Sequence, residues 1–209
     1  MTYRSPRIGI RCDVGPDIGV GHLMRCASLV GEMLDRGWHV EFCADSDSVP
    51  LAGERLAEIG CDVRPGLHSV SAHMAWVEES ALTASVFDSY LLDPDISRAV
   101  TTAIPTLTFI DGSTRGQSAS VYVDQNYGAE RAAWPIGGTS SPSAPRLAGS
   151  SYAVLADRVR RLRPTQPQLS AAIPPLTVVV ALGGTDALRF TETVVEAIKL
   201  LPLQCEVLV

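Results

Sequence analysis

The chain has 209 residues, with 17 Lys and Arg against 23 Asp and Glu, so its formal net charge is −6. This acidic balance argues against a protein that binds nucleic acid or an anionic membrane surface, because either function needs a basic face. Charged residues make up 19% and apolar residues 46%, which is typical of a globular protein. No apolar run reaches the ~18–20 residues of a membrane span, and the N-terminus carries no signal core, so we expect a cytoplasmic protein.

The five cysteines and four histidines do not follow the spacing of a zinc site or of a disulfide framework. We therefore expect reduced and mostly buried thiols, and no bound metal. Cys12 and Cys26 flank the most motif-rich segment, and for them a nucleophilic thiol is the alternative to small core residues.

Strand and helix patterns alternate over the first two thirds of the chain. Strands are expected over residues 7–11, 38–43, 61–64, 85–88, 106–110 and 121–124. Helices are expected over residues 21–36, 51–59, 72–82 and 95–103. This alternation predicts an α/β fold with a Rossmann-like parallel sheet covered on both faces, in which ligands bind beyond the carboxyl ends of the strands.

The composition changes after residue 130. Residues 134–151 are rich in Pro, Gly, Ser and Ala, and residues 157–175 carry clustered arginines followed by prolines, which favours a linker. The arginines suit either an anion site or a solvated helix end. Beyond them, a strand over 177–182, a helix over 190–201 and a strand over 204–209 are expected. We therefore divide the chain into an N-terminal domain (1–156), a linker (157–175) and an incomplete C-terminal nucleotide-binding domain (176–209).

A glycine-rich turn joins the first expected strand to the first helix. Gly19 and Gly21 let a ligand approach the backbone closely, and the helix that follows offers free N–H groups and a partial positive charge. That charge disfavours an imidazolium, so we expect His22 to be a neutral general base. Arg25, three residues on, is placed to pair with Asp13 or with a phosphate. A plain glycine turn with a capping histidine is the alternative. The spacing is not that of a dinucleotide-binding motif, so no nicotinamide or flavin cofactor is expected.

A second glycine turn, Gly183-Gly184-Thr185-Asp186, lies between a buried strand and a helix and suits a phosphate for the same reasons. Asp186 is either part of this anion site or only the cap of the helix. One such turn in each of two α/β segments indicates two domains that face each other across a nucleotide-binding cleft.

Further polar side chains follow the expected strands. Asp13, Asp88 and Asp111 each come directly after an apolar strand, so all three should lie at the carboxyl edge of the sheet. Tyr90 is placed to stack on a ligand or to hydrogen-bond to it, with packing at a strand end as the alternative. Asn126 is a further candidate of the same kind.

Taken together, the motifs resemble the family of the UDP-2,4-diacetamido-2,4,6-trideoxy-β-L-altropyranose hydrolase of pseudaminic acid biosynthesis. This family includes relatives described as spore-coat polysaccharide glycosyltransferase-like. The residues that carry the resemblance run in the family's order along the whole chain: Ile10-Arg11-Cys12-Asp13, Ile18-Gly19-Val20-Gly21-His22-Leu23-Met24-Arg25-Cys26, Phe87-Asp88-Ser89-Tyr90, Ile110-Asp111, Asp124-Gln125-Asn126, Gly149 with Tyr152-Ala153-Val154-Leu155, and Ala181-Leu182-Gly183-Gly184-Thr185-Asp186.

The resemblance implies a GT-B-like fold, with two Rossmann-like domains around a UDP-sugar. It implies that the catalytic histidine is His22, that the tyrosine of its Asp-Ser-Tyr motif is Tyr90, and that the second domain holds the diphosphate through Gly183, Gly184, Thr185 and Asp186. No cofactor is expected. The chain departs from the family at Gly112, where many members carry aspartate, and after Pro175, where only one strand–helix–strand unit follows.

Three functions are compatible with these observations. The first is hydrolysis of a UDP-sugar to UDP and a free amino-deoxy sugar, with His22 activating water. The second is a glycosyltransferase of the same fold, in which His22 deprotonates a hydroxyl of an acceptor. The third is a non-catalytic half-protein that binds a nucleotide sugar. The short second domain leaves apolar surface open, so we expect a homo-oligomer or a complementing chain.

Overall fold

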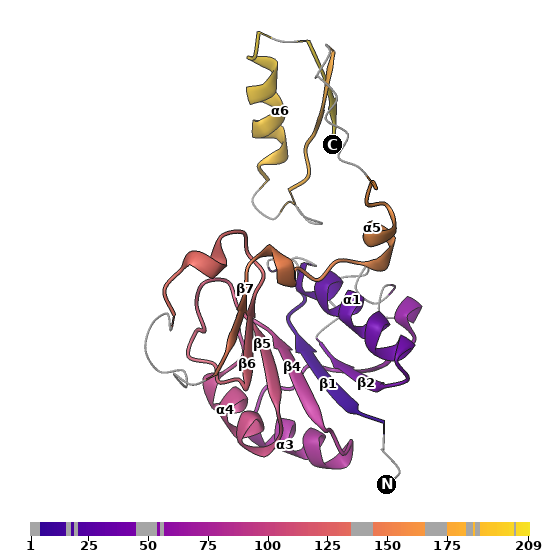
Figure 1. The fold of residues 1–209 in the computed structure, drawn as a ribbon, viewed down its shortest axis with the longest axis vertical. Coiled ribbons are helices and arrows are strands. Elements are labelled where there is room, and N and C mark those ends of the chain that lie inside the picture. Colours follow the sequence, from indigo (N-terminus) through magenta and orange to yellow (C-terminus); the bar gives the residue numbers. More distant parts are fainter. Residues whose placement is uncertain are drawn as a thin grey trace.

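The computed structural model describes residues 5–15, 18, 21–44, 54, 57–134, 144–165, 175–182, 186, 189–202 and 204–209. Its main part is a seven-stranded parallel sheet with the strand order β3-β2-β1-β4-β5-β6-β7 (Figure 1). The strands are β1 (Arg7–Cys12), β2 (His39–Cys43), β3 (Asp62–Arg64), β4 (Ala84–Asp88), β5 (Thr106–Phe109), β6 (Val121–Asp124) and β7 (Arg146–Ala148). The order reverses between β1 and β4, as in doubly wound Rossmann sheets. The expected α/β, Rossmann-like fold is confirmed.

Helices cover both faces of this sheet. Helix α1 (Gly21–Asp35) lies on one face, and α3 (Val70–Glu79) and α4 (Pro94–Ala103) lie on the other (Figure 1). In α1, Leu23, Ala27 and Val30 recur at helical spacing and are all buried against the sheet. Helix α4 begins with Pro94 in its first turn, where the missing N–H costs nothing. The central strands β1 and β4 are buried on both faces over almost their whole length, as is usual in a parallel sheet covered by helices on both sides.

Alternation along β1 divides the core into two halves. Ile8 and Ile10 belong to the cluster on the α1 side, whereas Gly9 faces α3. A Cβ atom added at Gly9 would lie 2.8 Å from Trp76 and 2.5 Å from Leu82. Glycine is therefore required there because the indole of α3 packs directly on the β1 backbone.

The last part of the chain forms a separate, smaller unit. After α5 (Asp157–Arg161), the strands β8 (Leu176–Val179) and β9 (Cys205–Leu208) pair in parallel and are connected through α6 (Thr191–Lys199) (Figure 1). No residue of α6 is buried, and large apolar side chains such as Val179 and Phe190 are exposed. The predicted strand–helix–strand order is confirmed, and the unit leaves most of its apolar surface open to solvent.

One strand is not predicted by the sequence pattern, and several predicted boundaries differ from those of the structure by one to three residues. This strand is β7, which has only three residues and lies within the Pro- and Gly-rich segment. Three residues are too short to show alternation, and the strand forms because Tyr122, Val123 and Asp124 pair with it. The expected linker contains α5, and its residues 166–174 lie outside the described part of the chain. The expected helix over 51–59 lies largely outside it as well.

All five cysteines are free, and Cys12, Cys26 and Cys43 are buried, as expected. Within the described ranges, no helix is both long and apolar enough to cross a membrane.

Candidate functional site

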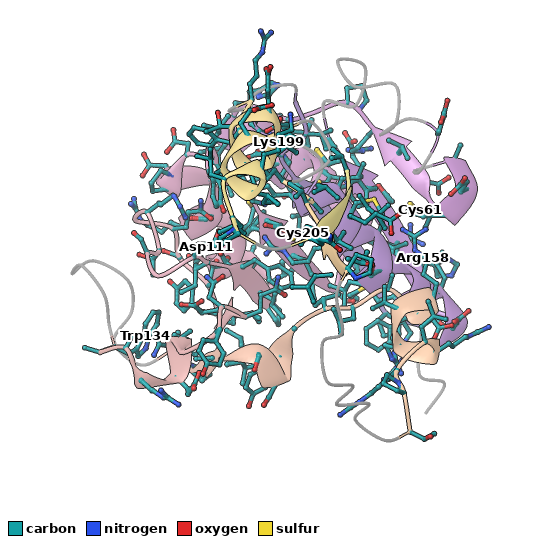
Figure 2. All side chains as sticks on the ribbon, turned by 90° about the horizontal axis from the view of Figure 1, so that it is seen from above. Cys61, Asp111, Trp134, Arg158, Lys199 and Cys205 are labelled. Carbon is teal, nitrogen blue, oxygen red and sulfur yellow. The ribbon has the colours of Figure 1, made fainter. Side chains whose placement is uncertain are left out.

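Acidic side chains gather at the carboxyl edge of the large sheet. Asp13 follows β1, Asp88 ends β4, Asp111 follows β5 and Asp124 ends β6. Figure 2 shows the molecule from above, and one member of this acidic group, Asp111, is labelled there. The position expected for Asp13, Asp88 and Asp111 is confirmed, and it lies at the reversal of strand order where α/β sheets bind ligands.

His22 lies in the first turn of α1 and is only 5% exposed. Its Nδ1 atom lies 2.5 Å from Oδ1 of Asp88 and 3.3 Å from Nη2 of Arg25. A carboxylate can only accept a hydrogen bond, and Asp88 is the nearer group, so Nδ1 carries the proton. The lone pair then lies on Nε2, for which no partner is found among the described residues. A histidine oriented in this way by a buried carboxylate is the arrangement of a general base.

Asp88 is the centre of this cluster and is almost fully buried. Arg25 contacts both of its oxygens, through Nε at 2.7 Å and Nη2 at 2.5 Å. Although burial raises the pKa of Asp88, the hydrogen bonds from His22 and Arg25 outweigh it and hold that pKa below its usual value. The pairing of Arg25 with Asp13 considered above is therefore wrong. Arg25 forms an ion pair with Asp88 instead, because its position on α1 places the guanidinium next to the end of β4.

The thiol of Cys26 lies on the same side of α1 and donates to Oδ2 of Asp88 at 3.5 Å. Burial raises the pKa of Cys26 well above its ordinary value, and the nearby Cys12 raises it further. Since the thiolate is the nucleophilic form, the structure favours the core role for Cys26.

Asp13 organises the turn that carries Tyr90. Its Oδ1 accepts from Oγ of Ser89 at 2.7 Å, and its Oδ2 accepts from the backbone N–H groups of Tyr90 and Leu91 at 2.7 and 3.1 Å. Nη1 of Arg11 lies 3.4 Å from the same carboxylate. Both oxygens of Asp13 are thus engaged within the protein, which favours a positioning role over direct contact with a substrate.

Tyr90 bridges His22 and Asp111. Its ring packs edge-on against the imidazole with 4.4 Å between the ring centroids, and its hydroxyl donates to Oδ2 of Asp111. Nδ2 of Asn126 donates to Oδ1 of Asp111 at 3.0 Å. Burial first, and then the bond to Asp111, raise the pKa of Tyr90 to about 12, so the phenol stays protonated at neutral pH. The structure therefore brings His22, Tyr90, Asp88, Asp111 and Asn126 together, and Tyr90 is 40% exposed.

The remaining candidates fall into two groups. Gly21 is the first residue of α1 and has open space where a Cβ would lie. Asp186 accepts from the backbone N–H groups of Phe190 and Thr191 at 3.0 and 3.2 Å, so it binds the first turn of α6, although the N-cap residue of that helix is Phe190. Gly19, Gly183, Gly184 and Thr185 lie outside the described residues.

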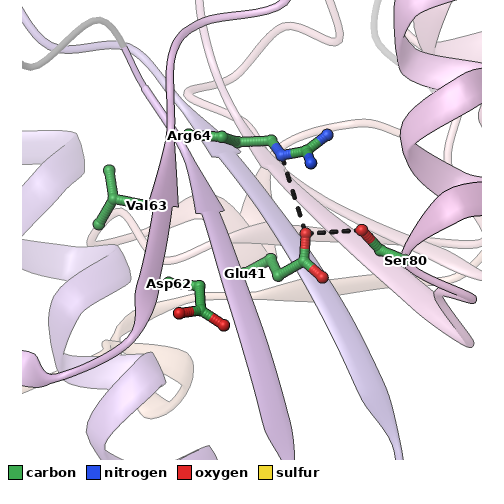
Figure 3. A pocket seen from close by; sticks show the side chains of 5 residues that line it. All are labelled: Glu41, Asp62, Val63, Arg64 and Ser80. Carbon is green, nitrogen blue, oxygen red and sulfur yellow. Dashed lines mark hydrogen bonds and ion pairs between the residues drawn. The ribbon is translucent and has the colours of Figure 1, made fainter.

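A second polar cluster lies away from this edge, around Glu41 on β2 (Figure 3). It lines a cavity of about 270 Å³ with Asp62, Val63, Arg64 and Ser80. The Glu41 carboxylate accepts from Oγ of Ser80 at 2.7 Å and from Nε1 of Trp76 at 2.8 Å, and Arg64 lies 3.8 Å away. Sequence patterns alone do not predict this cluster, because its members come from three separate segments of the chain.

No group of three or more His, Cys, Asp or Glu side chains that could hold a metal ion is found in the described part of the chain.

No protein-family model and no curated protein matches the chain. Among solved structures, it is similar to MurG of Acinetobacter baumannii, with a TM-score of 0.47 and 11% identity over 65% of this chain and 44% of that one. It is also similar to the glycotransferase of kitacinnamycin, with a TM-score of 0.37 and 17% identity over 51% of this chain and 30% of that one. The chain thus spans less than half the length of either protein.

Proposed function

We propose that this chain carries the general base, His22, of an enzyme that transfers a glycosyl group from a nucleotide sugar to a hydroxyl. The observation that carries the proposal is the 2.5 Å contact between Nδ1 of His22 and Asp88, which leaves Nε2 as the proton acceptor. This contact lies at the carboxyl edge where the strand order reverses between β1 and β4, which is where Rossmann-like sheets bind ligands.

In this proposal each residue of the cluster has a defined task. His22 removes the proton from the attacking hydroxyl, and Asp88 stabilises the imidazolium that forms. Arg25 keeps Asp88 ionised. The partly exposed Tyr90 holds a hydroxyl group of the sugar, and Asp111 positions its phenol. The nucleoside diphosphate is a good leaving group, so catalysis consists mainly of positioning and of stabilising its charge.

The acceptor hydroxyl belongs either to a second sugar or to water. Transfer to a sugar makes the enzyme a glycosyltransferase. Hydrolysis is favoured by the residue-level resemblance at Gly21-His22, Arg25 and Asp88-Ser89-Tyr90, and it requires no acceptor site. The burial of His22 also suits a small nucleophile such as water. In either reaction the nucleotide is UDP.

The test is to incubate the purified protein with UDP-sugars, with and without sugar acceptors, and to measure UDP release. His22→Asn, which keeps a donor at similar size but cannot act as a base, is the matched control. UDP release in water alone indicates hydrolysis, and release only with an acceptor indicates transfer. Binding of UDP without turnover would identify a non-catalytic half-protein, and equal turnover by His22→Asn would contradict the role of His22.

A further inference from the structure

The loop after β5 contains a tight turn with an unusual residue in it. Arg115 and Gly116 have φ values of 50° and 78°, and the N–H of Gln117 donates to the carbonyl of Thr114 at 2.9 Å. Two consecutive residues with positive φ inside such a four-residue turn define type I′, whose central positions favour Gly, Asn and Asp. Arginine is strained in this conformation, because its Cβ crowds the backbone. The backbone therefore does not explain why arginine occupies this position.

Two contacts fix this turn to its surroundings. A Cβ at Gly116 would lie 3.3 Å from Cγ of Pro94, so the turn packs closely on the start of α4. The buried Gln117 donates from Nε2 to the carbonyl of Ser89 at 2.8 Å. Ser89 directly precedes Tyr90, so Gln117 ties the Arg115 turn to the turn that carries the tyrosine.

The result is a guanidinium held above the Tyr90 ring. The Cζ atom of Arg115 lies 4.0 Å from the ring centroid. At this distance the guanidinium makes a cation–π contact with the ring, which uses none of its N–H groups as hydrogen-bond donors to a carboxylate. This arrangement offers donors for an anion next to Tyr90.

The ion pairs at this edge of the sheet also indicate Arg115 as the residue that binds an anion. Arg25 is paired with Asp88, Arg11 lies 3.4 Å from Asp13, and Arg146 lies 3.9 Å from Asp124. Within the described ranges, Arg115 has no carboxylate within ion-pair distance. Among the described residues at this edge, Arg115 thus has a positive charge that no carboxylate neutralises.

We propose that Arg115 binds the diphosphate of the ligand at this edge of the sheet, through the N–H groups of the guanidinium that it holds over Tyr90. This inference rests on the proposed function for the identity of the ligand. Arg115 is then a binding residue beyond the His22 cluster, and Gln117 positions it. The strained backbone is retained because a relaxed Asn or Gly at position 115 would lack the charge.

The experiment compares the wild-type protein with Arg115→Asn, in which the new residue is one that the turn prefers. Calorimetry measures the binding of inorganic pyrophosphate, of UDP and of uridine, and thermal unfolding gives the Tm. We expect the variant to keep or raise the Tm, because the strain is relieved. We expect its affinity for pyrophosphate and for UDP to fall about 10- to 100-fold, as for a lost charge-assisted bond. Uridine, which carries no phosphate, should be unaffected.

Arg131→Asn is the control for the lost charge, because Arg131 is exposed and lies near the same edge, in η2 (Ala129–Arg131). It should bind pyrophosphate as the wild type does. Arg115→Gly is the second variant, should Arg115→Asn fold poorly. Pyrophosphate affinity within two-fold of wild type in Arg115→Asn would overturn the proposal, and so would a wild type that binds no pyrophosphate. Arg115-dependent pyrophosphate binding without turnover of any UDP-sugar would refute the proposed function and leave this inference standing.

Discussion

Two carboxylates in this protein, the buried Asp88 and the partly buried Glu41, are held in similar ways but lie in different surroundings. Each is contacted by arginine, and in each case hydrogen bonds hold the pKa below its ordinary value against the opposing effect of burial. Asp88 also contacts His22 and lies at the carboxyl edge, where the strand order reverses. Glu41 contacts Trp76 and Ser80 and lies in the middle of β2.

The difference shows that an ion-paired carboxylate with a lowered pKa does not by itself identify a functional site. At Glu41 the partners are an indole N–H, a hydroxyl and guanidiniums, all of which only donate to the carboxylate. At Asp88 one partner is an imidazole with a second nitrogen that can accept a proton. We therefore expect substitutions in the Asp88 cluster to change turnover, and a substitution at Glu41 to change stability alone.

The largest effect is expected for His22→Ala. Loss of a general base lowers the rate by about 10²–10⁴-fold. UDP affinity should change little, because the proposed diphosphate contacts come from other residues. Steady-state assays of UDP release, together with calorimetry, measure both quantities. A variant that keeps half of the wild-type turnover would remove His22 from the mechanism.

Asp88→Asn should have the second largest effect. Turnover should fall by about 10²-fold or more, because the amide no longer fixes the imidazole tautomer. It should also change the dependence of stability on pH. The lowered pKa of Asp88 stabilises the fold above the ordinary carboxyl value near 4. This contribution is lost as the pH falls through the folded-state pKa, since the unfolded chain then binds more protons.

The Tm measured from pH 7 to pH 3 checks this second effect. The Tm difference between wild type and Asp88→Asn should shrink below about pH 4. A Tm difference that stays constant over this range would mean that Asp88 does not form a stabilising ion pair with Arg25.

Tyr90→Phe should be milder, with turnover within about ten-fold of wild type, because one hydrogen bond to Asp111 is lost. Titration offers a direct check. The phenol of Tyr90 should ionise at about 12, above an ordinary tyrosine, and folding stability should fall as the pH rises from about 10 towards that value. The ultraviolet difference spectrum between wild type and the Phe variant isolates this group. A phenol that titrates near 10 would indicate that it does not bond to Asp111.

Glu41→Gln should have the smallest effect on function. Turnover should equal that of wild type, since the cluster lies away from the carboxyl edge. The free energy of unfolding should fall by about 0.5–1.5 kcal/mol, because the charge that binds Arg64 and Arg7 is lost. Denaturant unfolding and the UDP-release assay measure the two quantities. Lost turnover in a stable Glu41→Gln variant would mean that the two clusters are coupled.

The sequence by itself determined the order of the elements and the place of the acidic residues. The apolar strands predict their own positions, and a polar residue after each of β1, β4 and β5 must reach the carboxyl edge, because parallel strands all end on the same side. The choice of His22, Tyr90, Asp88, Asp111 and Asn126 needed only this rule and the motifs around them. The short edge strand β7 escaped the prediction, since its formation depends on pairing with β6.

Only the tertiary structure decided which of these residues meet. Asp88 is 66 residues from His22 and 63 from Arg25, and the three come together because β4 pairs with β1 and α1 packs across both. The same pairing gives Arg25 to Asp88 and leaves Asp13 to hold the Tyr90 turn. Nothing in the local sequence around Arg115 predicts its contact with Tyr90, because that contact depends on the type I′ turn and on Gln117 reaching Ser89. Local patterns fix which edge a side chain reaches, whereas long-range strand pairing fixes its partner.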